Sequence, residues 1–552
     1  MKQFIQNGSR ILLRPQTNIL SAAFIIMVTY ALSHFLGLLK TRLLISYFFG
    51  STTYLLDAYY AAFVIPDTVF QLLVIGSLSA AFIPVFSRYL GKSESDAWRM
   101  ASSSLNLTLL IFTLVSAVIF IFTPALSHSL APGFNPHQLA TLSQLIRIML
   151  SAQFFFCISG FLTAMIQSRQ RFLVPALAPV VYNLGIIIGI IFFSPVFGIF
   201  GPAIGTVFGA ILHMAIQIPA AIRLGFRPRF SLDPSHPGVR EVLRLLPPRA
   251  LALGIDQVEQ FVAVVLASLL AAGSLSIFNV ARLLYVIPAS LFGVTIGQAV
   301  LPALSRQSSD SQRKHFNQTL TEVVLQVAFL ALPLSILFIV LRIPIVRLVF
   351  GAKSFPWAAT LLTGKTLAIL SLSASFAAVY QLISRAFYAL HDTRTPLGVG
   401  LLAAIVHVFL ATMAVKVLGW GVLGLATVLS TITIIETIVL FTILFRKISL
   451  PVLHLVFPLS KMLITAGITG ISLWLPMRLL DRFVFDTTRT VPLLALTAIT
   501  SLIGLFTYIF LSYLFHVEEI KSFLALARRV AAWPKFLNAP KSPEPIIPSD
   551  QP

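Results

Sequence analysis

Charged residues are scarce in this chain. Only 10% of its 552 residues are Asp, Glu, Lys or Arg, whereas an average soluble domain carries about 25%. Runs of about 20 apolar residues recur along nearly the whole length instead, and each is long enough to cross a bilayer as a helix. The roughly ten-residue alternation of a membrane β-barrel is absent. The composition therefore predicts an all-α polytopic membrane protein.

Cysteine is almost absent as well. The single cysteine, Cys157, lies in an apolar run, so it forms no internal disulfide and we expect it to serve packing. The sequence also lacks the phosphate-cradling glycine loop of ATPases, a His/Cys spacing typical of metal sites and a GxSxG elbow. We therefore expect no catalytic residues, no metal and no cofactor. The chain is predicted to be a transporter driven by an ion gradient, the membrane potential, substrate consumption or a partner.

The charge that is present is mostly positive. There are 39 Lys and Arg against 18 Asp and Glu, a net charge of +21. Nucleic-acid binding is one interpretation, but basic loops that face the cytoplasm explain the excess better in a membrane chain. With the N-terminus inside, Lys and Arg fall mainly in the loops of that side, most clearly over the first eight spans. We therefore predict that both termini are cytoplasmic.

The apolar runs predict about fourteen membrane-spanning helices. They are expected at residues 18–45, 55–86, 99–123, 141–166, 174–194, 200–222, 246–271, 274–303, 318–341, 359–388, 395–416, 421–445, 453–476 and 490–515.

Part of the sequence occurs twice. The run that starts at Ile65-Pro66 and ends at Ser87-Arg88 returns between Ile287-Pro288 and Ser305-Arg306, both times as IPxxxF followed by PxxSR. Further echoes link the stretch around Gly198 to that around Gly419 and the one before Pro175 to that before Pro396. Such a repeat predicts two pseudo-symmetric bundles that rock against each other in a transporter, with the site at their seam.

The repeat also sets the predicted domain organisation. It comprises a cytoplasmic N-terminal segment 1–17, a first six-helix lobe 18–222, a cytoplasmic linker 223–245, a second six-helix lobe 246–445, two appended helices within 446–516, and a basic, proline-rich cytoplasmic tail 517–552.

Several cations lie inside apolar spans, where an ionised side chain costs at least about 2.5–3.5 kcal/mol unless it has a partner or a cavity. Arg282 lies six residues before Pro288 in a long apolar run. His34 lies six residues before Lys40, roughly on the same helix face, and Arg42 follows. We predict that these four residues bind an anionic substrate group. The alternative is a side chain that snorkels to the interface, which applies most to Arg42.

Three acidic residues are candidates for gating or ion coupling. Asp57 opens the second span, where it could act in gating or serve as an interfacial cap or salt-bridge partner. Asp256 and Glu259 lie three residues apart on one face of the seventh span. They could bind a coupling cation or pair with Arg249 or Arg282.

The run SRAFYALHDTRTP, from Ser384 to Pro396, resembles the signature of the MurJ (MviN) family, lipid II flippases of bacterial peptidoglycan synthesis within the MOP exporter superfamily. Its charged residues Arg385, Asp392 and Arg394 are expected at a helix end, a tight cytoplasmic turn and a helix start. The resemblance covers nearly all of residues 18–515. It extends to Phe49-Gly50 before Asp57-Ala58, Ile65-Pro66-Asp67, Gly76 to Pro84, Ala131-Pro132-Gly133-Phe134, Arg171-Phe172, Pro175 to Pro179 with Tyr182-Asn183, and Ala281-Arg282-Leu283 to Pro302.

The resemblance implies two lobes around a central cationic cavity that opens alternately to each side. The cavity would carry the undecaprenyl-pyrophosphate-linked precursor from the inner to the outer leaflet of the bacterial inner membrane. The family's cavity cations fall on His34, Lys40 and Arg282. A coupling monovalent ion of unknown identity and cell-wall synthesis proteins as partners are further implications.

The chain departs from the family pattern at several charged positions. These positions hold uncharged residues here. They are Phe70 and Gln71 for the family's basic pair, Ile75 for its glutamate, Val64 for a further basic residue, and Tyr285 for the acidic residue after the span-eight arginine. Three other interpretations follow. They are a flippase for another polyprenyl-linked saccharide, a MATE-type cation-coupled exporter of small molecules, and a scaffold that transports nothing.

Overall fold

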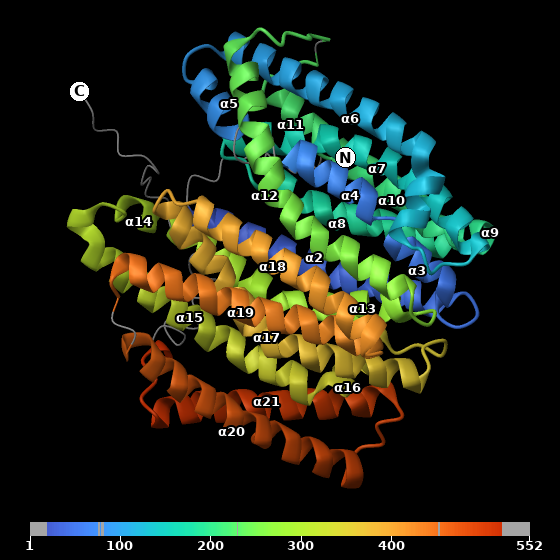
Figure 1. Cartoon of the computed structure of the whole chain (residues 1–552), viewed down its shortest axis with the longest axis vertical. Helices are drawn as coiled ribbons and strands as arrows, with labels where there is room; N and C mark the ends of the chain where they lie inside the picture. The colour runs from blue at the N-terminus through green and yellow to red at the C-terminus, as the bar shows by residue number, and fades with distance from the viewer. Residues whose placement is uncertain (1–18, 76–77, 79–81, 229, 451–452, 521–552) are drawn as a thin grey trace, which may run out of the picture. The chain divides into compact units, whose positions relative to one another are not determined.

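The structure is a computed structural model, and it describes residues 19–75, 78, 82–228, 230–450 and 453–520. The predicted N-terminal segment 1–17 and the tail beyond residue 520 lie outside this part of the chain. The described residues form helices joined by turns and loops, with no strand among them (Figure 1). The predicted all-helical membrane architecture is therefore confirmed.

Twelve helices or helix runs in the described part of the chain are long and apolar enough to cross a membrane. The two remaining predicted spans, 18–45 and 246–271, correspond to α2 (Ile19–Phe48) and α12 (Pro237–Ser268), which have 30 and 32 residues. Helices of that length exceed the bilayer core.

The chain divides into two compact units after Gly273. Within the described residues, the first unit runs to Gly273 and the second begins at Ser274. The linker predicted at 223–245 lies inside the first unit, because α12 begins at Pro237 and contacts helices α4 (Val64–Phe70), α5 (Ile83–Leu90) and α6 (Glu94–Leu130) there. The division into units thus falls after α12, whereas the sequence repeat places the lobe boundary before it.

In the first unit, α7 (Pro136–Ser168) is the central helix, with α3, α4, α5, α6, α10 and α11 packed against it. The remaining elements of this unit are α3 (Thr53–Ala61), η1 (Gln71–Ile75), α8 (Leu173–Ile188), η3 (Gly189–Phe193), α9 (Ser194–Phe197), α10 (Phe200–Ala215) and α11 (Ile218–Arg223).

In the second unit, α17 (Trp357–Ala389) has the central position. Small buried side chains such as Ala374, Ala378 and Ala386 let neighbouring helices approach it closely. Figure 1 shows α20 and α21 side by side at the end of this unit. The other elements are α13 (Ser274–Pro288), η4 (Ala289–Val294), α14 (Thr295–Arg306), η5 (Asp310–Gln312), α15 (Arg313–Val340), α16 (Arg342–Phe350), α18 (Arg394–Thr412), η6 (Met413–Val417), α19 (Gly421–Ile448), α20 (Leu453–Phe483) and α21 (Thr490–Leu514).

The sequence repeat recurs in the irregularities of the backbone. A π-helical segment follows Pro66 (η1) and another follows Pro288 (η4). A left-handed residue precedes α8 and α18 at matching positions, Gln170 with φ 56° and His391 with φ 58°. The π-helical segments η3 and η6 precede Gly198 and Gly419, which also have positive φ. Both copies therefore share the same helix breaks.

Glycines bring α8 and η3 into backbone contact with α10. A Cβ on Gly189 would lie 2.4 Å from the Cα of Gly205, and a Cβ on Gly185 would lie 2.3 Å from the Cα of Gly209. Residues four apart on each helix thus form a small-residue seam, which is typical of close packing between membrane helices.

We expect Gly189→Ala to separate these helices and lower the free energy of unfolding by about 1–3 kcal/mol, as overpacking does elsewhere. The measurement is the melting temperature of the detergent-purified protein. Gly467→Ala is the matched control, because a Cβ there meets nothing within 4 Å. Equal melting temperatures for the two variants would contradict the packing described.

Candidate functional site

Lys40 lies half-buried on α2, between that helix and α8. Its ammonium is 6.0 Å from the centre of the Tyr182 ring. The Tyr182 ring in turn packs edge-on against Phe156 of α7, with 4.9 Å between ring centroids. An aromatic face attracts a cation within about 6 Å, so the ring helps to hold Lys40 inside the helix bundle.

An acidic residue that we did not select from the sequence accompanies Lys40. Asp67 of α4 interacts electrostatically with Lys40 and accepts a hydrogen bond from the Gln153 side chain of α7. The only signal in the sequence was an aspartate directly after Pro66 inside an apolar span. Lys40 and Asp67 thus interact electrostatically within the membrane-spanning part of the first unit, and such an interaction lowers the cost of a charge there.

A second contact fixes α2 to α8 one residue before His34. The Asn183 amide donates to the backbone carbonyl and to the hydroxyl of Ser33, both at 3.1 Å, and to the Pro179 carbonyl at 3.2 Å. The bond to the Pro179 carbonyl lies within α8, whereas the two bonds to Ser33 reach α2. His34 and Arg42 are themselves half-buried on α2. Asn183 thus sets the register of the helix that carries three of the four predicted cations.

Asp57 is buried, with 2% of its surface exposed. Its carboxylate accepts a hydrogen bond of 2.6 Å from the backbone N–H of Gly273. Gly273 has φ +94°, a conformation that glycine adopts freely, and α13 begins at the next residue. A carboxylate bound to a main-chain N–H is a charge-assisted hydrogen bond. Asp57 therefore anchors the α12–α13 loop to α3.

A second contact holds the same stretch of chain. The Gly133 N–H donates to the Ser268 hydroxyl at 3.3 Å, and a Cβ on Gly133 would lie 2.2 Å from the Ser268 carbonyl oxygen. Only glycine permits this approach, so the end of α12 packs directly against the Ala131-Pro132-Gly133-Phe134 motif.

The predicted ion-coupling pair lies on α12. Glu259 is half-buried, and the side chain of Asp256 lies outside the described residues. Between them, Gln257 accepts a hydrogen bond of 3.4 Å from the Thr68 hydroxyl of α4. In the described part of the chain, no three His, Cys, Asp or Glu side chains come together as metal ligands.

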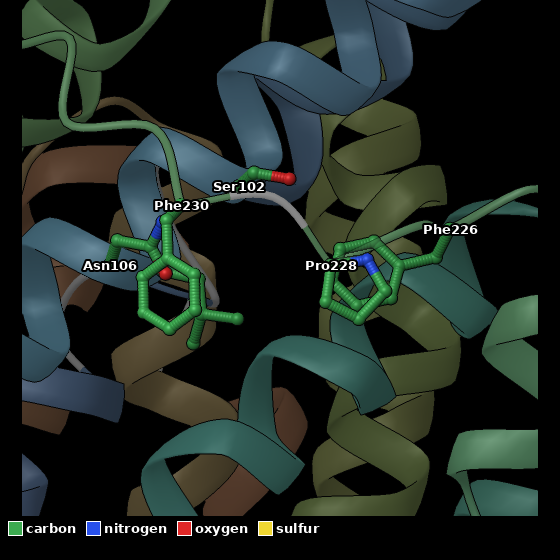
Figure 2. A pocket seen from close by; sticks show the side chains of 6 residues that line it. Ser102, Asn106, Phe226, Pro228 and Phe230 are labelled. Atoms are coloured by element: carbon green, nitrogen blue, oxygen red, sulfur yellow. The ribbon is translucent and has the colours of Figure 1, made fainter.

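The segment between α11 and α12 is fastened to α6. Asn106 donates to the Ser231 carbonyl at 3.0 Å, and Arg99 pairs with Asp233 at 2.8 Å. A pocket of about 70 Å³ lies beneath, lined by Ser102, Leu105, Asn106, Phe226, Pro228 and Phe230 (Figure 2). Ligand sites usually measure about 300–1,000 Å³. This pocket is too small for a lipid headgroup.

Arg282, the fourth predicted cation, lies half-buried on α13 of the second unit. The signature motif lies in the same unit. Arg385, near the end of α17, donates to the carbonyls of Gly293, at 3.4 Å, and Val294. Arg394 is exposed at the start of α18. Of the three charged residues in the motif, Arg385 contacts the helix break that follows α13.

Asp392 ties the α17–α18 turn to α19. It accepts hydrogen bonds from the Thr395 N–H at 3.0 Å, the Thr395 hydroxyl at 2.7 Å and the Lys447 ammonium at 2.5 Å. Partial burial alone would raise the pKa of Asp392, but the hydrogen bonds from Lys447 and Thr395 outweigh it and lower the pKa to about 2. The predicted tight turn is thus closed by its own aspartate.

Comparison with known proteins points to one family. The family model described as "Lipid II flippase MurJ" matches residues 45–492. A protein of Bdellovibrio bacteriovorus named "Probable lipid II flippase MurJ" is 27% identical, over 91% of this chain and 96% of its own length. A protein of Thermosipho africanus named "Lipid II flippase MurJ" is 26% identical, over 92% and 99% respectively.

Solved structures agree. The structure titled "Lipid II flippase MurJ, inward closed conformation" has a TM-score of 0.74 and 25% identity, and the match covers 90% of this chain and all of that one. An inward-facing multidrug-resistance MATE transporter of the MOP superfamily has a TM-score of 0.61 at 14% identity, over 77% of this chain and 98% of its own. The latter likeness concerns the fold alone.

The Asp392 hydrogen bonds predict a defined pH dependence of stability. Because the folded-state pKa lies below the ordinary aspartate value of 3.8, the stabilisation is fully present above about pH 4 and is lost as the pH falls towards 2. We expect Asp392→Asn to lower the melting temperature at neutral pH, by a margin that shrinks below about pH 4. Glu322→Gln, at an exposed position of α15, is the control and should change little. A margin that is constant down to pH 2 would contradict this account.

Proposed function

Because the chain belongs to the MurJ family of lipid II flippases, we propose that it moves lipid II, the undecaprenyl-pyrophosphate-linked peptidoglycan precursor, from the inner to the outer leaflet of the bacterial inner membrane. The observation that carries this proposal is the family match across residues 45–492, which include twelve of the fourteen predicted spans in full. The family match favours this function over a MATE-type exporter, which the fold likeness alone supports, and over a flippase for another saccharide.

The diphosphate of the substrate needs several hydrogen-bond donors in the membrane interior. We propose that Lys40 and His34 of the first unit and Arg282 of the second unit supply them, with Arg42 as a further cation near the end of α2. Ammonium and guanidinium groups suit phosphate oxygens, because each offers several donors and a positive charge.

Asp67 interacts electrostatically with Lys40. We propose that the diphosphate takes the place of Asp67 as the anion nearest to Lys40, so that the ammonium keeps a negative neighbour with and without substrate. The pair would thus lower the cost of an empty site.

Two positions at which the family carries charge have other roles here. The Phe70 ring lies 6.0 Å from that of Phe156, beside the Tyr182 ring that holds Lys40. Tyr285 is 7% exposed and accepts a hydrogen bond of 3.5 Å from Ser373 of α17. We propose that this protein recognises the same diphosphate with fewer charges, the lost ones being replaced by packing.

Alternating access requires a gate that opens and closes. We propose that the Asp57–Gly273 hydrogen bond is part of that gate, because it fixes the last residue before α13. A monovalent ion at Asp256 and Glu259 is our proposal for coupling. We further propose that both termini are cytoplasmic and that cell-wall synthesis proteins are partners.

The substrate proposal is tested by depleting the lipid II flippase of a bacterium and expressing this chain in its place. We expect growth and outer-leaflet lipid II to be restored by the wild type and lost with Lys40→Ala or Arg282→Ala at equal membrane expression, because the diphosphate loses a donor. Lys40→Arg, which keeps the charge, should restore growth. Full rescue by both alanine variants would contradict the site.

The gate proposal is tested with Asp57→Asn. The amide oxygen still accepts from Gly273, but it carries no charge, and hydrogen bonds to charged groups contribute about 1.5–3 kcal/mol against about 1 kcal/mol for neutral ones. We expect faster labelling of a cysteine placed at Ser274 in this variant than in the Asp57 parent. An unchanged labelling rate would show that Asp57 does not restrain this loop.

A further inference from the structure

The second unit must satisfy backbone carbonyls along its helix break. In η4 and the two residues before it, several carbonyls receive hydrogen bonds from side chains. Ser290 donates to the Ile287 carbonyl at 3.0 Å, and Thr295 donates to the carbonyls of Ser290 and Leu291 at 3.0 and 2.7 Å. These two side chains belong to the broken helix itself.

Arg385 supplies the next donor, and it comes from another helix. Its guanidinium reaches the carbonyls of Gly293 and Val294, the last two residues of η4. A Cβ on Gly297 would lie 2.3 Å from the same guanidinium nitrogen. The Arg385 side chain therefore occupies the space that a side chain at residue 297 would fill.

Three contacts attach the broken helix to α17, and they follow one another in the same order along both helices. Tyr285 bonds Ser373, Gly293 lies against the backbone of Ala378, and Val294 bonds Arg385. A Cβ on Gly293 would be 2.5 Å from the Ala378 carbonyl oxygen. Arg385 makes the contact at the end of the break, and Tyr285 makes the contact before it, three residues after Arg282. The angle at the break, and with it the direction of α13, depends on both ends of this attachment.

The matching position of the first unit carries no arginine. Arg385 lies six residues before the left-handed residue His391, and the residue six before the matching Gln170 is Ala164, which is buried. In that unit a side-chain pair, Gln153 with Asp67, connects α7 to the broken helix. The guanidinium brace is thus a feature that the duplicated copies do not share.

We propose that Arg385 is a positioning residue for substrate binding: it holds the break at 289–294 in shape and thereby keeps Arg282 aligned with the anionic headgroup. The inference rests on the proposed function. A binding group must be held by a supporting shell, because small displacements of a charged donor weaken its bonds. The RAFYALHDTRTP motif would then serve the site from a distance.

The test is a double-mutant cycle on lipid II binding by the purified full chain, with melting temperatures recorded for every variant. We expect Arg385→Ala to weaken lipid II binding about tenfold in the wild type but less than about twofold in an Arg282→Ala background. Arg385→Lys, which can still donate to a carbonyl, should recover part of the loss. Gly297→Ala should mimic Arg385→Ala, because the new methyl displaces the guanidinium, and should add nothing to it.

The results distinguish a positioning role of Arg385 from a general effect on the stability of the protein. An equal loss of affinity in both backgrounds would overturn the proposal, since a general structural defect does not act through Arg282. Unchanged affinity in Arg385→Ala would overturn it too. A wild-type protein that does not bind lipid II would contradict the proposed function and this role of Arg385 together, whereas binding that is insensitive to Arg385 contradicts only the latter.

Discussion

A backbone carbonyl that loses its helical donor inside a bilayer has no water to replace it. This constraint governs the two helix breaks that follow Pro66 and Pro288. Each break continues as a π-helical segment, so the chain stays helical while its hydrogen-bond pattern changes. Around η4, hydroxyls and a guanidinium supply the donors. Such donors are in place along η4, and the predicted anion-binding residue Arg282 lies on α13, the helix that leads into it.

Charged side chains inside the membrane likewise depend on partners from the protein. Lys40 is accompanied by an aromatic face and a carboxylate, and Asp57 is paired with a main-chain N–H. At two positions where the sequence resemblance implies further charges in the family, this chain has Phe70 in an aromatic cluster and Tyr285 in a hydrogen bond. A chain with fewer charged side chains in the membrane needs fewer groups to pair with them. The cations that remain are those expected to contact the substrate. The duplicated units have also diverged in how they hold their breaks, with a Gln–Asp pair in one and an arginine in the other.

Much of the fold could be predicted from the sequence, because apolar length and the position of proline act locally. The helical class, the spans and the repeated breaks at Pro66 and Pro288 follow from such patterns. The boundary between units could not be predicted, since α12 packs with the first unit through contacts distant in sequence. Asp57 was recognisable as unusual, but its partner is the N–H of Gly273, and main-chain donors leave no mark in a sequence. Asp67 was missed because its partners, Lys40 and Gln153, come from other helices.

The central claim is that this chain transports a lipid with a diphosphate headgroup. Its most direct measurement is the movement of fluorescent lipid II across the membrane of vesicles that contain the purified protein, with a polyprenyl monophosphate of the same tail as the comparison. We expect rapid movement of lipid II and much slower movement of the monophosphate lipid, because the half-buried cations of the proposed site suit two phosphates. Equal rates for both lipids, or no movement above protein-free vesicles, would contradict it.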